Sequence, residues 1–335
     1  MRLWKPMLLL GLMVALLPSA GRSQTTKVAT SKPATAERIA TPSAKKLMLW
    51  ELKGKTNTVY MFGSIHLGNA SFYPLHPVIE KAFQRSQQLS IEVDESKHKK
   101  PMEDFVKKHG IYSGRRSLKD DLSKAGMAKF DAFIMNHMMG MGMILKRMRP
   151  WMIAVTIVTV QLQRLGYSAW YGLDDHFIRK AKSRKIGGKF MPILEMETAE
   201  YQLKMLSNFK KEVLEEYLMS TLTPIGELKK SFEAIVKHWK AGDTKAFAKE
   251  ALSQLAKLKS GPILYDRIFA QRNAGMASKI EGYLKSGVKT FAIAGAGHFV
   301  GKRNIIELLR AKGYKVRQCT TDHFKQKASS RPVKK

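Results

Sequence analysis

Clustered and alternating apolar positions define two short strands near the start of the chain. The runs Leu47–Lys53 and Thr58–Gly63 are rich in β-forming residues, and the polar turn residues 54–57 separate them, which predicts a β-hairpin. A helical period follows from Pro77 to Gln87, and the compact run Gln88–Val93 predicts a third strand. This order of strand, helix and strand is typical of an α/β core.

The middle of the chain, residues 101–260, has a mainly helical period, with Phe190–Leu194 as a strand candidate inside it. The pattern beyond it predicts a helix, a buried strand, a helix and a last strand at Leu264–Lys285, Thr290–Ala294, Asn304–Ala311 and Lys315–Cys319. We therefore expect an α/β fold. Its mixed sheet is split between the two ends of the chain, with a large helical insertion between them.

The start of the chain is typical of a secretory signal peptide over residues 1–23. Arg2 and Lys5 precede the apolar run Met7–Leu17, and small residues follow up to Ser23. We therefore expect a periplasmic or secreted protein. Residues 24–45 have the composition of a disordered linker, residues 46–320 form the predicted domain, and residues 321–335 form a basic tail.

The formal net charge of +32 reflects 59 Lys and Arg against 27 Asp and Glu. In an exported protein, this charge favours attraction to anionic lipids or polymers of the envelope, although a solvated basic surface is the simpler interpretation. Nucleic acid is disfavoured as a partner, because no nucleic-acid motif accompanies the charge. The pattern does not indicate an oligomeric state.

Two Gly-x-x-His sequences carry the candidate chemistry. Each one, ending at His66 and at His298, stands where a predicted strand gives way to a loop. The ends of such strands line the ligand crevice of an α/β sheet, so the two imidazoles can converge. Glu92 ends the strand between them. The chain has one cysteine, Cys319, so an intramolecular disulfide and a cysteine-based zinc site are both excluded, and His and carboxylate groups would hold any metal.

A methionine-rich stretch has two interpretations. Thioethers bind Cu(I), but methionine also fills helical cores and forms adaptable apolar surfaces that face a peptide or a membrane, which we favour here. Seven methionines lie in this stretch: Met127, Met135, Met138, Met139, Met141, Met143 and Met148.

Several motifs, in order along the chain, resemble the TraB/GumN family, which is related to the Tiki metalloproteases and the pheromone-shutdown proteins. The motifs are Phe62–His66, Ile91–Asp94, Arg149–Ala154, Gly172–Asp174, Leu194–Thr198 with Gln202, Arg272-Asn273 and Gly295–Gly301. The resemblance covers about residues 47 to 319. It implies the fold of the erythromycin-esterase and haem-binding ChaN-like proteins.

The resemblance also implies site residues. It assigns His66, His298 and Glu92 to a divalent metal ion, which could be zinc, manganese, cobalt or iron. Asp174, Glu197 and Arg272 match other family positions and are candidates for catalytic or substrate-contacting roles; ion pairs that tie the insertion to the core are the alternative. Glu195 precedes the family's usual Glu-Thr pair, which leaves open whether it or Glu197 faces the site.

Three functions are compatible with these residues. The first is metal-assisted hydrolysis of an amide or ester bond, most simply in a peptide or protein, with Glu92 as third ligand or general base and Arg272 as oxyanion stabiliser. The second is a regulatory protein that binds haem, metal or peptide without turnover. The third is an envelope-binding protein driven by charge. We rank them in that order.

Overall fold

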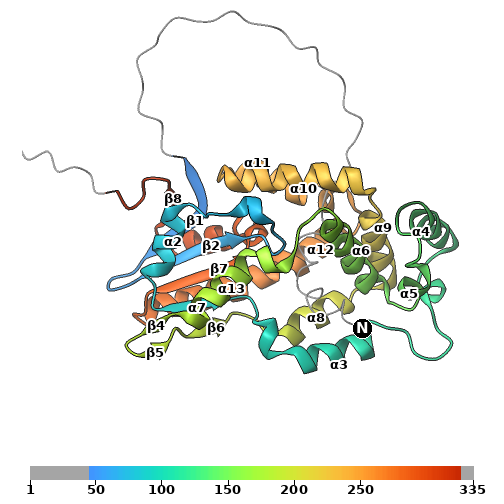
Figure 1. The fold of residues 1–335 in the computed structure, drawn as a ribbon, viewed down its shortest axis with the longest axis horizontal. Helices are drawn as coiled ribbons and strands as arrows, with labels where there is room; N and C mark the ends of the chain where they lie inside the picture. Colours follow the sequence, from blue (N-terminus) through green and yellow to red (C-terminus); the bar gives the residue numbers. More distant parts are fainter. Residues whose placement is uncertain (1–44, 326–335) are drawn as a thin grey trace, which may run out of the picture.

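The computed structural model describes residues 45–325. The predicted signal peptide, the predicted linker up to residue 44 and the tail from residue 326 lie outside these residues. Figure 1 shows a sheet at one end of the long axis and a group of helices at the other. No helix within residues 45–325 is long and apolar enough to cross a bilayer.

Six strands form one mixed sheet in the order β6-β3-β7-β2-β1-β8. The strands are β1 (Lys46–Lys53), β2 (Thr58–Ser64), β3 (Gln88–Ile91), β6 (Ile193–Glu195), β7 (Thr290–Gly295) and β8 (Val316–Thr320). β6, β3, β7 and β2 run parallel, whereas β1 is antiparallel to both β2 and β8. The predicted α/β fold, with a sheet built from both ends of the chain, is confirmed.

β7 lies at the centre of the parallel strands, between β3 and β2. All six of its residues are buried, as expected for a strand that is covered on both faces. The predicted hairpin is confirmed: β1 pairs with β2, and the amide of Gly54 donates to the carbonyl of Asn57 across the turn. Its aromatic and aliphatic side chains join the continuous apolar core beneath the helices.

The helices cover the sheet and form most of the inserted segment. They are α2 (Pro77–Gln84), α3 (Lys99–His109), α4 (Lys124–His137), α5 (Gly142–Lys146), α6 (Pro150–Arg164), α7 (Leu173–Ser183), α8 (Ala199–Ser207), α9 (Lys211–Thr221), α10 (Ile225–Lys240), α11 (Thr244–Leu252), α12 (Gly261–Tyr265), α13 (Gln271–Lys285) and α14 (Ile305–Ala311). α6 is buried along nearly its whole length, which explains why its sequence is apolar on all sides.

Two predicted elements are divided in the structure. The predicted strand Phe190–Leu194 is wrong as one element: Phe190 belongs to a small hairpin of β4 (Lys185–Ile186) and β5 (Lys189–Phe190), and β6 begins only at Ile193. Pro192 separates the two, because proline has no N–H for a strand ladder. The predicted helix from Leu264 to Lys285 contains a π-helical segment, Asp266–Ala270, between α12 and α13.

Candidate functional site

The carboxyl ends of the four parallel strands meet at one edge of the sheet. Ser64 at the end of β2 stands in register with Gly295 at the end of β7, so the chain turns toward His66 and His298 from neighbouring positions. Glu92 follows β3, which pairs with β7, and Glu197 follows β6, which pairs with β3. The topology thus brings these side chains, distant in sequence, to the same edge.

His66 is fixed by the start of α7. Its Nδ1 lies 2.7 Å from Oδ2 of Asp174, and the hydroxyl of Ser64 donates to Oδ1 of the same carboxylate at 2.9 Å. Gly172 makes this contact possible, since a Cβ there would lie 2.2 Å from the carbonyl oxygen of His66. The amide of Leu173 donates to the carbonyl of Ile65, which ties the helix start to the His66 turn.

His298 is held deeper in the molecule. Its Nδ1 lies 2.6 Å from Oδ1 of Asn273, and its ring packs against Phe269 with the centroids 5.4 Å apart. The side chain of His298 is 2% exposed, compared with 15% for His66. The two turns approach closely because Gly63 has no side chain: a Cβ there would lie 3.1 Å from Cα of Ala296.

Glu92 is the centre of a buried charge cluster. Its Oε2 accepts from Nη2 of Arg272 and, at 3.3 Å, from Gln202, while its Oε1 accepts from the amide of Gly295 at 2.6 Å. Oε1 also lies 3.8 Å from Nε2 of His298. Both oxygens of Glu92 are therefore engaged, and one of them faces the His298 ring.

Arg272 binds two carboxylates at once. Besides Glu92, it contacts Glu197, with Nε 3.0 Å from both oxygens of that carboxylate and Nη2 2.6 Å from Oε2. Its Nη1 donates to the carbonyl of Ile268 in the π-helical segment. The arginine is 1% exposed, so its charge is balanced by the two glutamates rather than by water.

The structure distinguishes the two glutamates of the β6 motif. Glu195 turns away from Arg272 and accepts from the amide of Asp94 at 2.6 Å and from His98 at 2.9 Å. Glu197 is therefore the residue that joins the Glu92 cluster.

The pKa values of the two histidines are shifted in opposite directions. Burial lowers the pKa of His66, but the charge and hydrogen bond of Asp174, with smaller contributions from Glu92 and Glu95, outweigh it and raise the pKa to about 9. Burial and the positive charge of Arg272 lower the pKa of His298 to about 3. Burial also disfavours the charged form of Glu92, yet Arg272 and the two histidines lower its pKa to about 2. At neutral pH, His66 is thus a cation and His298 is neutral.

His66 opens onto a cavity of about 520 Å³. Glu92 and the segment after it form one wall, Asp174, Asp175 and other residues of α7 form a second, and Trp170 stands at its rim, 63% exposed. His298 and Arg272 are not among the lining residues, but both contact Glu92, which is one of them.

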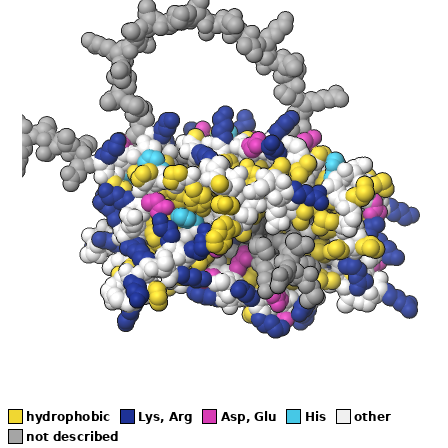
Figure 2. Space-filling model, in the orientation of Figure 1, with side chains coloured by type: hydrophobic (Ala, Val, Ile, Leu, Met, Phe, Trp, Pro, Cys, Tyr) yellow, Lys and Arg dark blue, Asp and Glu magenta, His cyan; other side chains and the backbone are white. Residues whose placement is uncertain are grey.

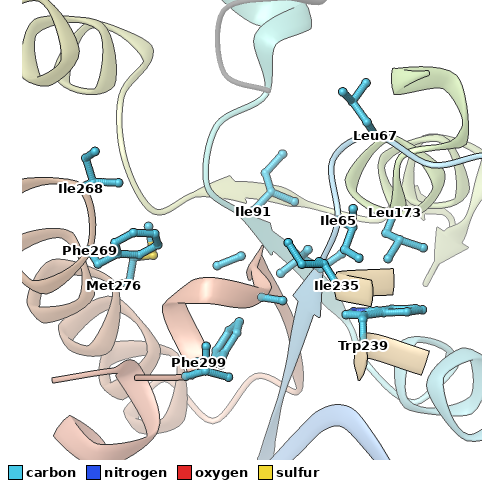
Figure 3. Close-up of a cluster of buried hydrophobic side chains, with 14 of the residues drawn as sticks. Ile65, Leu67, Ile91, Leu173, Ile235, Trp239, Ile268, Phe269, Met276 and Phe299 are labelled. Atoms are coloured by element: carbon cyan, nitrogen blue, oxygen red, sulfur yellow. The ribbon is translucent and has the colours of Figure 1, made fainter. Parts of the chain in front are cut away.

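Figure 3 shows a cluster of buried apolar side chains, several of which are sequence neighbours of these polar groups. Ile65 and Leu67 flank His66, Ile91 precedes Glu92, Leu173 precedes Asp174 and Phe299 follows His298, and all five are buried. These side chains exclude water behind the cavity and strengthen the electrostatic interactions of the site.

The ring orientations fit a metal or a proton-transfer role. In each histidine an oxygen acceptor holds Nδ1, which makes Nε2 the nitrogen that a ligand would meet. Among residues 45–325, no three His, Cys, Asp or Glu side chains are grouped closely enough to form a ready metal site. Two oriented imidazoles and an ionised carboxylate nevertheless suit a divalent ion, which would displace the proton from Nε2 of His66 on binding.

The structure brings all six sequence candidates to this edge, in two subgroups: His66 with Asp174, and Glu92 with Arg272 and Glu197 beside His298. The sequence analysis named Asn273 and Gln202 in motifs without giving them a role, and it missed Ser64. Two sequence features point to such residues. One is a polar residue at the end of an apolar strand, and the other is a polar residue next to an arginine on a buried helix.

Comparisons with known proteins support the family resemblance of the sequence. The sequence pattern of the TraB/PrgY/gumN family matches residues 48–318. The uncharacterized protein YbaP of Escherichia coli is 25% identical over 255 residues, which cover 75% of this chain and 87% of YbaP. An uncharacterized protein of Treponema pallidum is 22% identical over 282 residues, covering 81% of this chain and 82% of that protein. No solved structure matches this chain.

Proposed function

This chain belongs to the TraB/PrgY/gumN family, and from that premise we propose that it is a metal-dependent hydrolase that acts on peptide or protein substrates. One observation carries the proposal: two imidazoles, each oriented through Nδ1, lie at the same edge of the sheet as Glu92, which is 3.8 Å from Nε2 of His298 and lines one cavity together with His66. Such preorganisation is typical of catalytic sites rather than of surface histidines.

In this proposal, His66, His298 and Glu92 hold a divalent ion, which could be zinc, manganese, cobalt or iron. When bound, the ion would lower the pKa of a coordinated water and polarise the carbonyl of the scissile bond. Asp174 keeps the His66 ring in place through Nδ1, and Asn273 does the same for His298. Arg272 is a positioning residue, because its N–H groups bind Glu92 and Glu197 and so fix the carboxylate that faces His298.

Glu92 serves as a ligand rather than as the general base. Arg272 and the neighbouring histidines lower the pKa of Glu92 to about 2, which makes it a weak base, and its three hydrogen bonds leave one of the roughly four acceptor positions of the carboxylate for an ion. The cavity beside His66 provides room for an extended segment of substrate, with Trp170 exposed at its rim.

The test is metal analysis of the purified chain by mass spectrometry after incubation with each candidate ion. The wild type should retain about one equivalent per chain, and His66→Ala and His298→Ala should lose it. His176→Ala is the matched control, since this half-buried histidine binds Glu80 on the outer side of α7 and should keep the metal. Unchanged metal content in both site variants would contradict the assignment.

Turnover is tested separately with a peptide library, with and without a chelator. Chelator-sensitive cleavage that the two histidine variants lack would support hydrolysis. A second function, metal, haem or peptide binding without turnover, is favoured by one observation: the ion pair with Arg272 helps to lower the pKa of Glu92 to about 2, so this carboxylate is a poor base. Stoichiometric metal without cleavage, or a visible haem band on titration, would indicate this binding function instead.

A further inference from the structure

The end of the molecule opposite the sheet carries a tip of exposed apolar side chains on α4, α5 and the turn between them. Its members, here called the methionine tip, are Met135, Met139, Met143 and Ile144, which are 69%, 84%, 86% and 56% exposed. Isolated exposed apolar residues are ordinary on a protein surface. Four of them within ten positions are unusual for a surface that contacts only water, and such groups mark interaction sites.

The methionine tip is built into the fold. Beneath it, Met138 and Leu145 are fully buried, and the amide of Met138 donates to the carbonyl of Ile134 at the end of α4. Gly140 turns the chain with a positive φ of 86°, and a Cβ at Gly142 would meet Ile134 at 3.3 Å. The turn is therefore packed from below, while its methionines point away from the core. Methionine side chains are flexible and adapt to irregular apolar surroundings.

Positive charge surrounds the methionine tip. Between residues 124 and 148 the chain has four Lys and Arg and a single acid, Asp131, which pairs with Lys146 at 2.8 Å. Arg164 binds the carbonyl of His137 next to the tip. Arg147 donates to the carbonyl of Gly114, which brings Arg115 to the same end, together with Arg116, which pairs with Asp121 at 3.2 Å. Figure 2 shows yellow apolar and dark-blue basic side chains side by side at this end.

We propose that the methionine tip inserts into the surface of an anionic lipid bilayer and docks the protein there. The combination of exposed apolar side chains with flanking Lys and Arg matches both layers of such a surface, the acyl boundary and the negative headgroups. A second copy of this chain fits less well, because it would bring two basic ends together. The docking does not depend on the candidate site, which lies at the carboxyl edge of the parallel strands, whereas α4 and α5 stand at the far end of the long axis from the sheet (Figure 1).

The first experiment uses a fluorophore at the methionine tip of the full chain. Met143→Cys is labelled with an environment-sensitive dye, and labelling is selective because Cys319, the only native cysteine, is buried. Phe190→Cys is the matched control, since Phe190 is 63% exposed on the β5 hairpin at the opposite end. Vesicles of phosphatidylglycerol and phosphatidylethanolamine should shift the emission of the tip label to the blue and leave the control label unchanged. Phosphatidylcholine vesicles should shift neither.

The second experiment separates the methionine tip from the general charge of the chain. Changing Met139, Met143 and Ile144 to Ser together should lower the partition coefficient onto the anionic vesicles on the order of tenfold or more, because the apolar contact is lost while the charge remains. Ile263→Ser, 52% exposed elsewhere, should partition as the wild type does. An unshifted tip label, an unchanged partition of the triple variant, or a tip-dependent dimer without vesicle binding would overturn the proposal.

Discussion

Arg272 is a buried cation between two buried carboxylates, and its removal leaves Glu92 and Glu197 without their counter-charge. Such a broken buried ion pair destabilises a fold by about 3–5 kcal/mol, so Arg272→Met should lower the free energy of unfolding by that amount in urea titrations. The exposed pair of Lys204 and Glu200 is the control, and Lys204→Ala should change stability by less than about 1 kcal/mol. Equal losses of unfolding free energy in the two variants would show that Arg272 does not act as the counter-charge of Glu92 and Glu197.

The pair of His66 and Asp174 makes stability depend on pH. Because the pKa of His66 is raised from 6.5 to about 9 in the folded chain, the protonated ring stabilises the fold fully below pH 6.5, and this contribution is lost as pH rises through about 9. In the presence of a chelator, the urea midpoint of the wild type should fall over this window. Asp174→Asn should remove most of the fall, whereas Asp104→Asn, an exposed carboxylate on α3, should keep it. Parallel curves for Asp174→Asn and the wild type would refute this account.

At the scale of elements, the close approach of the two Gly-x-x-His turns depends on Gly63. A Cβ there would lie 3.1 Å from Cα and 3.2 Å from Cβ of Ala296, so Gly63→Ala should force the turns apart and lower stability by about 1–3 kcal/mol. Gly282→Ala in α13, where a Cβ meets nothing within 4 Å, should instead raise stability by up to about 1 kcal/mol. Both are measured by urea unfolding. If Gly63→Ala were neutral, the steric reason for the first motif glycine would be wrong.

The sequence pattern predicted the strands that precede the two histidines and Glu92, because each strand is a short apolar run bounded by turn residues. β2, β3 and β7 end within two residues of the expected positions, and the site side chains stand just beyond them. The strand at 190–194 was misplaced because a short apolar run gives no period that separates a hairpin tip from a sheet strand. The π-helical segment 266–270 has no pattern of its own, since its residues fit an α-helix equally well.

The convergence of the two histidines was a hypothesis that the strand order supports, since β2 and β7 are neighbours and parallel. Their unequal burial could not be predicted. It follows from what packs on each turn: α7 and the cavity beside His66, and α13 with Phe269 over His298. Likewise, no periodicity indicated that Glu197, and not Glu195, turns toward Arg272. The direction of a side chain after a strand depends on the loop.

At the scale of the whole molecule, the two ends of the described chain close the sheet together. β8 pairs with β1, and the side-chain Nε2 of Gln318 donates to the backbone carbonyls of Leu47 and Gly242. Cys319 lies buried in β8, where burial and nearby Glu51 raise the pKa of its thiol to about 12.

We therefore expect Cys319 to report on this closure. At mildly alkaline pH it should react with a thiol reagent roughly a hundredfold or more slowly than a free cysteine, because little thiolate forms and the strand must open first. The same chain in urea should react at the rate of an ordinary cysteine, which is the control. Rapid reaction of the native chain would mean that β8 detaches from β1 readily.

The position of β7 has a consequence for the order in which the molecule is made. β2 and β3 leave the ribosome early, yet in the finished sheet they do not touch, because a strand made much later stands between them. That late strand also delivers His298, and the backbone amide of Gly295 that engages Glu92. A nascent chain thus carries the first imidazole for most of its synthesis without the second, and the candidate site can be completed only after β7 has been made.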